Sequence, residues 1–107
     1  MGFKNYFTEA TNNDVIAKFF DNDKLKDGGG AGNLLYQDLV NGYALLNYST
    51  PLLYKDNKGK KYVCNTDKFS STTSKIQKLI QAAAKERGIR LEEVDTNKIE
   101  DIIEREN

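Results

Sequence analysis

The chain has 107 residues, of which 38% are hydrophobic and 30% charged, and its formal net charge is zero. This is the length of one ordinary domain, which can bury a core without metals or disulfides. The absence of histidine excludes a Ser-His-Asp triad, a Cys-His pair and a His-ligated zinc site. The lone Cys64 excludes an internal disulfide and indicates a reducing compartment.

The sequence carries no signal for a membrane or for export. No apolar run approaches the roughly 20 residues that are needed to span a bilayer. Residues 1–10 are too polar for the apolar region of a signal peptide. We therefore expect a cytoplasmic protein with no membrane partner, folded as a single α+β domain over residues 1–107.

The first third of the chain is expected to form an entry segment, one helix and a loop. Residues 3–7 are aromatic and short, which is typical of an edge strand or of a segment packed on the core. The side chains of residues 11–14 can cap the first turn of a helix that ends near residues 21–23. Its apolar stripe consists of Val15, Ile16, Phe19 and Phe20. Residues 21–32 are rich in glycine and should form a loop.

A short second helix is expected next. Asn33 is a suitable cap for a helix over residues 34–40, and Asn41-Gly42 fits a left-handed cap at its end. The expected buried side consists of Leu35, Tyr36, Leu39 and Val40.

The middle of the chain is expected to be β structure. Residues 43–48 and 52–55 are strand-like, and we expect one long strand bent at Pro51, because Ser-Thr is a poor two-residue hairpin turn. Asp56–Gly59 is a strong turn signal, with glycine where a positive φ is needed. The return strand is expected at residues 60–65, and alternation places Tyr62 and Cys64 on one face and Lys61 and Val63 on the other.

The last third is expected to form two helices. A Ser/Thr run opens a helix over about residues 73–87, which should pack through Ile76, Leu79, Ile80 and Ala83. Asp95 or Thr96 then caps a helix over about residues 97–105. The remaining apolar residues should be buried at the connection and in that helix: Ile89, Leu91, Val94, Ile99, Ile102 and Ile103. The expected fold class is α+β, a small antiparallel hairpin or sheet at about residues 43–65 packed against three to four short helices.

Charge is unevenly distributed along the chain. Residues 51–91 carry 10 basic and 3 acidic side chains, a net charge of +7, whereas residues 92–107 carry 2 basic and 7 acidic side chains, a net charge of −5. Solvated faces that neutralise each other explain this pattern most simply. A basic surface for a charged partner is the functional interpretation.

No catalytic or metal-binding motif emerges. The Asp21-x-Asp23 pair fails as a calcium loop, because Lys26 and Gly32 stand where glycine and a bidentate glutamate are needed. The glycine run at residues 28–32 lacks the Gly-Lys-Ser/Thr ending of a phosphate loop. The acidic residues near the C-terminus match a solvated helix face. We therefore expect no enzyme activity, no cofactor and no metal.

The start of the helix at residue 73 is the candidate site. The free N–H groups of a first helical turn favour anions, and hydroxyl and lysine side chains gather near it and in the preceding hairpin. Plain helix capping is the alternative reading of the hydroxyls. The candidate partner- or phosphate-binding residues are Lys58, Lys60, Lys61, Lys68, Thr72, Thr73, Ser74, Lys75 and Lys78. We expect the five lysines at positions 58, 60, 61, 75 and 78 to form one exposed basic surface.

Three segments carry a resemblance to known proteins. Residues 48–51 (Tyr-Ser-Thr-Pro) precede a lysine-rich hairpin, residues 62–66 (Tyr-Val-Cys-Asn-Thr) and residues 69–75 (Phe-Ser-Ser-Thr-Thr-Ser-Lys). This order resembles a pattern in small uncharacterised proteins of phages and mobile elements. The resemblance covers about residues 43–80 and implies a mobile-element origin and not an activity. Small proteins of that origin include anti-CRISPR and other anti-defence inhibitors, and also DNA-binding accessory proteins.

The expected function is therefore a non-enzymatic protein that binds a macromolecular partner, such as an inhibitor of a host defence complex. The expected partner is a host or phage protein, and the oligomeric state is open. The alternative is a nucleic-acid-binding accessory protein that uses the basic hairpin and the helix at residues 73–87. Zero net charge weighs against this alternative, because sequence-independent binding of nucleic acid depends on neutralising phosphates.

Overall fold

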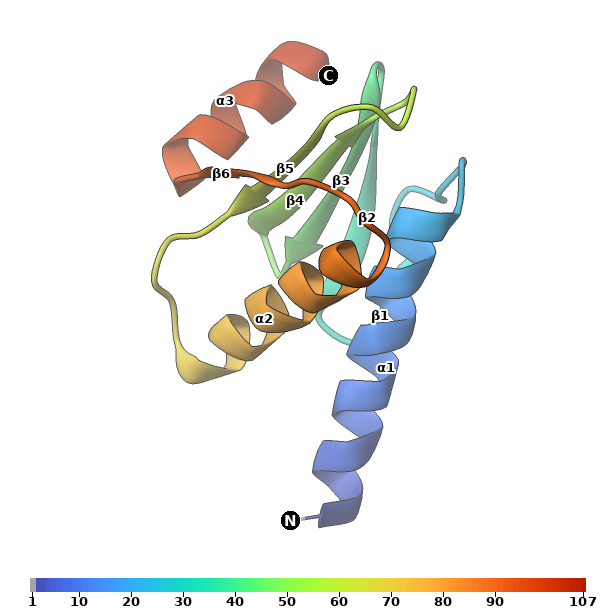
Figure 1. Cartoon of the computed structure of the whole chain (residues 1–107), viewed down its shortest axis with the longest axis vertical. Coiled ribbons are helices and arrows are strands. Elements are labelled where there is room, and N and C mark those ends of the chain that lie inside the picture. Colours follow the sequence, from blue (N-terminus) through green and yellow to red (C-terminus); the bar gives the residue numbers. More distant parts are fainter. Residues whose placement is uncertain (1) are drawn as a thin grey trace.

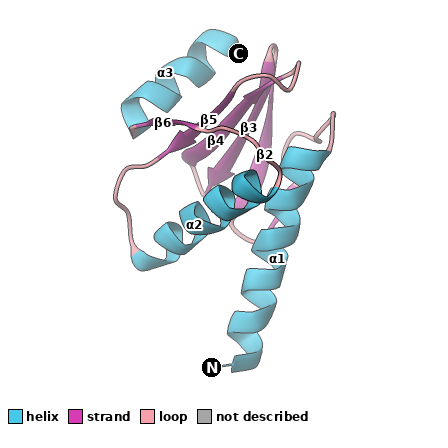
Figure 2. Ribbon diagram, in the orientation of Figure 1, coloured by secondary structure: helices cyan, strands magenta, loops and turns pink. Residues whose placement is uncertain are grey.

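The computed structural model describes the backbone of residues 2–107 and the side chains of residues 11–107. It contains three helices and one six-stranded sheet (Figure 2). In chain order the elements are α1 (Gly2–Asp21), β1 (Gly30–Ala31), β2 (Leu34–Leu39), β3 (Gly42–Asn47), β4 (Thr50–Asp56), β5 (Tyr62–Asn65), α2 (Ser71–Glu86), β6 (Glu92–Val94) and α3 (Thr96–Glu106). The strands lie side by side in chain order, and only β5 and β6 are parallel.

The sheet separates two layers of helices. Helices α1 and α2 cover one face, and α3 lies behind the other face, against β4 and β5 (Figure 1). The larger core cluster joins α1 and α2 to the first face, and a smaller cluster joins α3 to the second. The expected α+β class is confirmed, but the sheet is larger than the hairpin that the sequence predicts.

Helix α1 begins much earlier than predicted. It is continuous from Gly2 to Asp21, so residues 3–7 are helical, and the prediction of an edge strand there is wrong. Whether this segment packs on the core concerns side chains outside the described residues. No proline or glycine interrupts residues 3–20, so nothing in the backbone forces a new start at residue 11. The predicted stripe is buried, with Ile16 and Phe19 fully enclosed.

Residues 34–39 form strand β2, so the helix predicted at residues 34–40 is wrong. Burial along this strand alternates: Leu34 and Tyr36 are buried against the larger cluster, while Leu35 is exposed. Val40 is also exposed, and with Asn41 it forms a two-residue turn instead of a helix cap, because Leu39 pairs with Gly42. The spacing of the apolar residues fits the period of a helix and that of a strand, and hydrogen-bonded pairing with β3 makes the segment a strand.

Strands β3 and β4 form a hairpin, so the single bent strand predicted around Pro51 is wrong. Asn47 pairs with Thr50, and the turn consists of Tyr48 and Ser49. Tyr48 has a φ of 57°, the left-handed conformation that normally calls for glycine or asparagine. Pro51 is instead accommodated next to a register shift in the pairing of these strands.

The turn after β4 agrees with the prediction. Gly59 has a φ of 67°, and the Oδ1 atom of Asp56 accepts hydrogen bonds from the backbone N–H groups of Lys60 (2.7 Å) and Lys61 (3.0 Å). On β5, Tyr62 and Cys64 pack in the larger cluster and Val63 in the smaller one, as the alternation predicts.

The C-terminal helices match the sequence, but strand β6 was not foreseen. Ser70 caps α2, and Asp95 caps α3 through a 2.8 Å hydrogen bond from the N–H group of Lys98. Glu92–Val94 forms a three-residue edge strand beside β5, too short and too acidic to show a strand pattern.

Candidate functional site

The predicted site residues fall into two groups at opposite ends of the sheet. The turn between β4 and β5 holds Lys58, Lys60 and Lys61 at the top of Figure 1, and α2 begins at the lower left. Strand β5 and the loop after it run between these two places (Figure 1). The five lysines therefore do not form the single basic surface that the sequence predicts, because a strand intervenes where a short connection was expected.

At the start of α2, the hydroxyl groups mostly serve the fold. The Oγ1 atom of Thr73 accepts a 2.9 Å hydrogen bond from the Nδ2 atom of Asn47, and the Ser70 side chain caps the N–H group of Thr73. Ser74 donates to the backbone oxygen of Phe69 at 3.5 Å. These contacts support helix capping as the role of Thr73 and Ser74.

The remaining members of this group point to solvent. Thr72 is exposed, as are three lysines, and among residues 11–107 no acidic side chain pairs with these lysines. Lys68 and Lys78 border a shallow hollow with Ser74. The lysines of this group are Lys68, Lys75 and Lys78.

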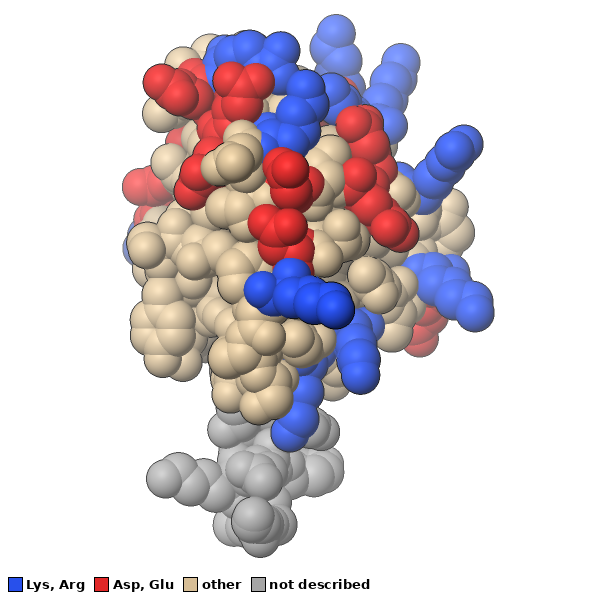
Figure 3. All heavy atoms as spheres, turned by 90° about the vertical axis from the view of Figure 1, so that its left-hand side faces the viewer, with Lys and Arg blue, Asp and Glu red and all other residues tan. Residues whose placement is uncertain are grey.

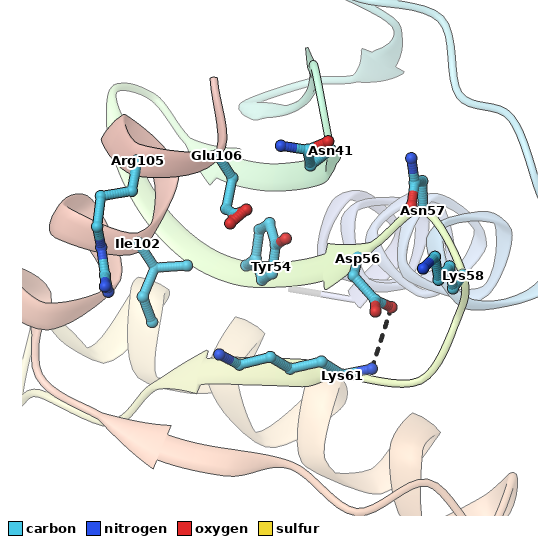
Figure 4. Close-up of a pocket in the computed structure, with 9 residues that line it drawn as sticks. All are labelled: Asn41, Tyr54, Asp56, Asn57, Lys58, Lys61, Ile102, Arg105 and Glu106. Carbon is cyan, nitrogen blue, oxygen red and sulfur yellow. Dashed lines mark hydrogen bonds between the residues drawn. The ribbon is translucent and has the colours of Figure 1, made fainter.

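At the other end of the sheet, Lys58 and Lys61 line a pocket of about 320 Å³ (Figure 4). Three chain segments surround it: the turn between β2 and β3, the turn after β4 and the end of α3. The backbone N–H group of Asn41 donates to the oxygen of Glu106 (3.1 Å), and that of Asn57 donates to the oxygen of Asn41 (3.0 Å). These bonds tie the three walls together, so the fold itself sets the shape of the pocket.

Tyr54 lies in the middle of this pocket, between the carboxylates of Glu106 and Asp56 (Figure 4). Its side chain is 2% exposed, and its ring passes across Gly42, where an added Cβ atom would lie 2.9 Å from the ring and 2.3 Å from the oxygen of Lys55. Burial raises the pKa of Tyr54 to about 12, and Glu106 and Asp56 add to this shift. The hydroxyl group therefore stays protonated at neutral pH.

Lys60 faces a second hollow, which it shares with Lys61, Arg90 and two glutamates of β6. Acidic and basic side chains thus alternate around this end of the molecule. Figure 3 shows the same mixture over the upper part of one side, where red and blue side chains lie next to each other. A surface of mixed sign is a weak attractor for a polyanion.

A surface without charges lies at the lower end of the sheet, on the same face as α3 but beyond the part that α3 covers. Strand partners Leu35 and Leu46 share this face, and the turn at Tyr48 and Ser49 lies beyond them. The exposed or partly exposed residues of this uncharged patch are Asn33, Leu35, Leu46, Tyr48, Ser49 and Thr50. No Asp, Glu, Lys or Arg occurs in residues 28–37 or 39–54. Figure 3 shows a broad tan area at its lower left that matches this gap in charge.

Tyr48 is the most prominent residue of the uncharged patch. It is 69% exposed although its backbone is left-handed, and its N–H group donates to the oxygen of Asn33 (2.8 Å). The sequence prediction missed it because it placed Tyr48 inside a strand. The sequence signal that could have indicated this turn is the presence of strand-like residues on both sides of Tyr48-Ser49.

No protein-family model, curated protein sequence or solved structure matches this chain. Within residues 11–107, no three His, Cys, Asp or Glu side chains lie close enough together to hold a metal ion. No helix in the described part of the chain is long and apolar enough to cross a membrane.

Proposed function

We propose that this protein is a non-enzymatic binding protein that holds another protein against the uncharged patch. The observation that carries the proposal is the exposed, left-handed Tyr48. For an L-residue this conformation costs about 1–2 kcal/mol. Tyr48 regains little of this cost by burial, because its side chain is 69% exposed. Strained residues of this kind gather at binding and switch sites, where the strain has a use.

The chemistry of the patch favours a protein as the partner. Interface centres are depleted in charge and enriched in tyrosine, and a few such anchors carry most of the binding free energy. A nucleic acid needs basic groups on the contact surface to neutralise its phosphates. The uncharged patch has none, and the lysines predicted to bind phosphate are split between two ends of the sheet.

The resemblance of residues 43–80 to proteins of phages and mobile elements bears on the class of partner. It includes Tyr48 and the adjoining Ser-Thr-Pro, which form the turn and the beginning of β4. We infer that the partner is a host protein and that binding inhibits a host defence complex, as anti-CRISPR proteins do.

The test is a comparison of three forms of the protein in capture from a host-cell extract. Tyr48→Asn removes the anchor and keeps a residue that tolerates the left-handed conformation. Val40→Asn is the matched control, because Val40 is 73% exposed at the first position of another two-residue turn. We expect the wild type and Val40→Asn to capture the same partner protein from the extract. In titration, Tyr48→Asn should bind that partner at least about tenfold more weakly than the wild type does.

Equal binding of that protein by wild type and Tyr48→Asn would show that the patch is not the contact surface. The nucleic-acid alternative is tested by titration with single- and double-stranded DNA and RNA at about 0.15 M salt. Micromolar binding that is lost when Lys60 and Lys61 are both changed to Glu would favour the alternative over a protein partner.

A further inference from the structure

The residue Tyr54 is 2% exposed, and its hydroxyl group opens into the pocket without a hydrogen bond to the described part of the chain. Figure 4 draws no hydrogen bond from it to the other eight residues that line the pocket. Tyr36 provides the contrast in the same sheet, since its hydroxyl donates to the oxygen of Val15 at 2.7 Å. The Tyr54 hydroxyl is therefore available to a group that enters the pocket.

The two carboxylates beside Tyr54 define what that group must be. Asp56 uses its Oδ1 atom for the turn and keeps the second oxygen as an acceptor, and Glu106 forms no ion pair among the described residues. A bare anion placed between them would be repelled. A hydroxyl group fits, because it can donate to a carboxylate and accept from a tyrosine.

The outer part of the pocket has the opposite character. Lys58 and Lys61 are exposed and have no acidic partner within residues 11–107. Among the described side chains, Arg105 pairs with Asp101 alone, at 3.3 Å on the surface. Ammonium and guanidinium groups with free donors are typical ligands of phosphate.

We propose that this pocket binds a sugar phosphate, with sugar hydroxyl groups at Tyr54, Asp56 and Glu106 and the phosphate at the surrounding lysine and arginine side chains. A volume of about 320 Å³ is in the range of small-ligand pockets. A simple sugar phosphate and a free ribonucleotide share this chemistry. The site lies at the opposite end of the sheet from the uncharged patch and does not depend on it (Figure 1).

Calorimetric titration with ribose 5-phosphate, adenosine monophosphate, ribose and inorganic phosphate tests the proposal. We expect a phosphorylated sugar to bind at least about tenfold more tightly than ribose or inorganic phosphate, because only it satisfies both halves of the pocket. Tyr54→Phe keeps the ring and should weaken binding about three- to tenfold. Lys61→Gln should do the same, whereas Lys85→Gln, at an exposed lysine of α2 on the other face of the sheet, should have no effect.

Binding of adenosine monophosphate but not of ribose 5-phosphate would identify the ligand as a nucleotide. Three results would overturn the proposal: no binding of either phosphorylated sugar at about 1 mM, affinity equal to that of inorganic phosphate, or unchanged binding by both Tyr54→Phe and Lys61→Gln. Lys61 is exposed, so its variant should stay folded even if Tyr54→Phe does not.

Discussion

Tyr48 shows how one side chain can oppose the local preference of its backbone. The favoured hairpin turns of two residues have positive φ values, which glycine and asparagine adopt at low cost. Tyr48 adopts a φ of 57° with a large ring that remains in solvent. The turn forms because the pairing of β3 with β4 supplies the free energy that the turn itself lacks.

Tyr48→Asn should therefore raise the free energy of unfolding by about 0.5–1 kcal/mol, since asparagine tolerates the left-handed conformation better. Chemical denaturation measures this change. Val40→Asn should change stability by less than about 0.5 kcal/mol, because Val40 has no positive φ. A Tyr48→Asn protein that is less stable than the wild type would mean that the tyrosine ring stabilises the fold.

Cys64 gives the fold a dependence on alkaline pH. Burial, with a smaller effect from Glu93, raises the pKa of its thiol from 9.0 to about 11. The folded state favours the protonated thiol. The contribution of Cys64 to the free energy of unfolding is therefore complete below pH 9 and is lost as the pH rises through about 11.

The free energy of unfolding should fall by up to about 2–3 kcal/mol over this interval because of Cys64 alone. Urea denaturation of wild type and Cys64→Ala between pH 8 and 11 isolates the effect, because Tyr54 titrates in both proteins. Parallel pH profiles of the two proteins would contradict the prediction.

At the scale of the element, α2 forms where the apolar periodicity predicts a helix, but its most deeply buried residues differ slightly from the predicted ones. The fully buried positions are Ile76, Ile80 and Ala84, while Leu79 and Ala83 are only partly buried. Packing against both α1 and the sheet selects which edge of the apolar stripe is innermost. The periodicity defines the stripe but not this final rotation.

Ile80→Ala should cost about 2–5 kcal/mol, as expected for a large-to-small change in a close-packed core. Leu79→Ala should cost less, because part of its side chain already contacts water. Thermal or chemical denaturation compares the two. A larger loss for Leu79→Ala would show that the innermost edge of the helix has been assigned wrongly.

At the scale of the molecule, Asn65 joins the sheet to helices on both faces. Its Nδ2 atom donates to the oxygen of Pro51 (3.0 Å) and to the Oγ1 atom of Thr96 (2.9 Å), where α3 begins. Its backbone oxygen accepts from the Nε2 atom of Gln77 on α2 (2.9 Å). Asn65 is 2% exposed, so the oxygen of Pro51 and the hydroxyl group of Thr96 depend on its side chain for these bonds, whereas Gln77 bonds to its backbone.

Asn65→Leu should lower the free energy of unfolding by about 2–4 kcal/mol, because it keeps the branched shape of the side chain but leaves buried polar groups without partners. Thr66→Ala, at the exposed neighbouring position, should cost less than about 1 kcal/mol. Differential scanning calorimetry of both variants measures the contrast. Equal melting temperatures would mean that the Asn65 network adds nothing to the attachment of α3.

The sequence by itself determined the elements whose signals are local. The caps at Ser70 and Asp95, the apolar stripes of the helices and the turn at Gly59 all depend on neighbours within a few residues. These features follow from backbone geometry and side-chain spacing alone. They were sufficient for the α+β class and for most of the buried helical residues.

Only the tertiary structure decided the features that depend on distant partners. Residues 34–39 became a strand because β3 pairs with them, and Lys55 became buried because its Nζ atom donates to the backbone oxygens of Phe19 and Asn22 at the end of α1. Three separate chain segments line the pocket around Tyr54. The uncharged patch lies where α3 no longer covers the sheet. Such sites arise from contacts between residues far apart in the chain, whose pairing free energy no local pattern reveals.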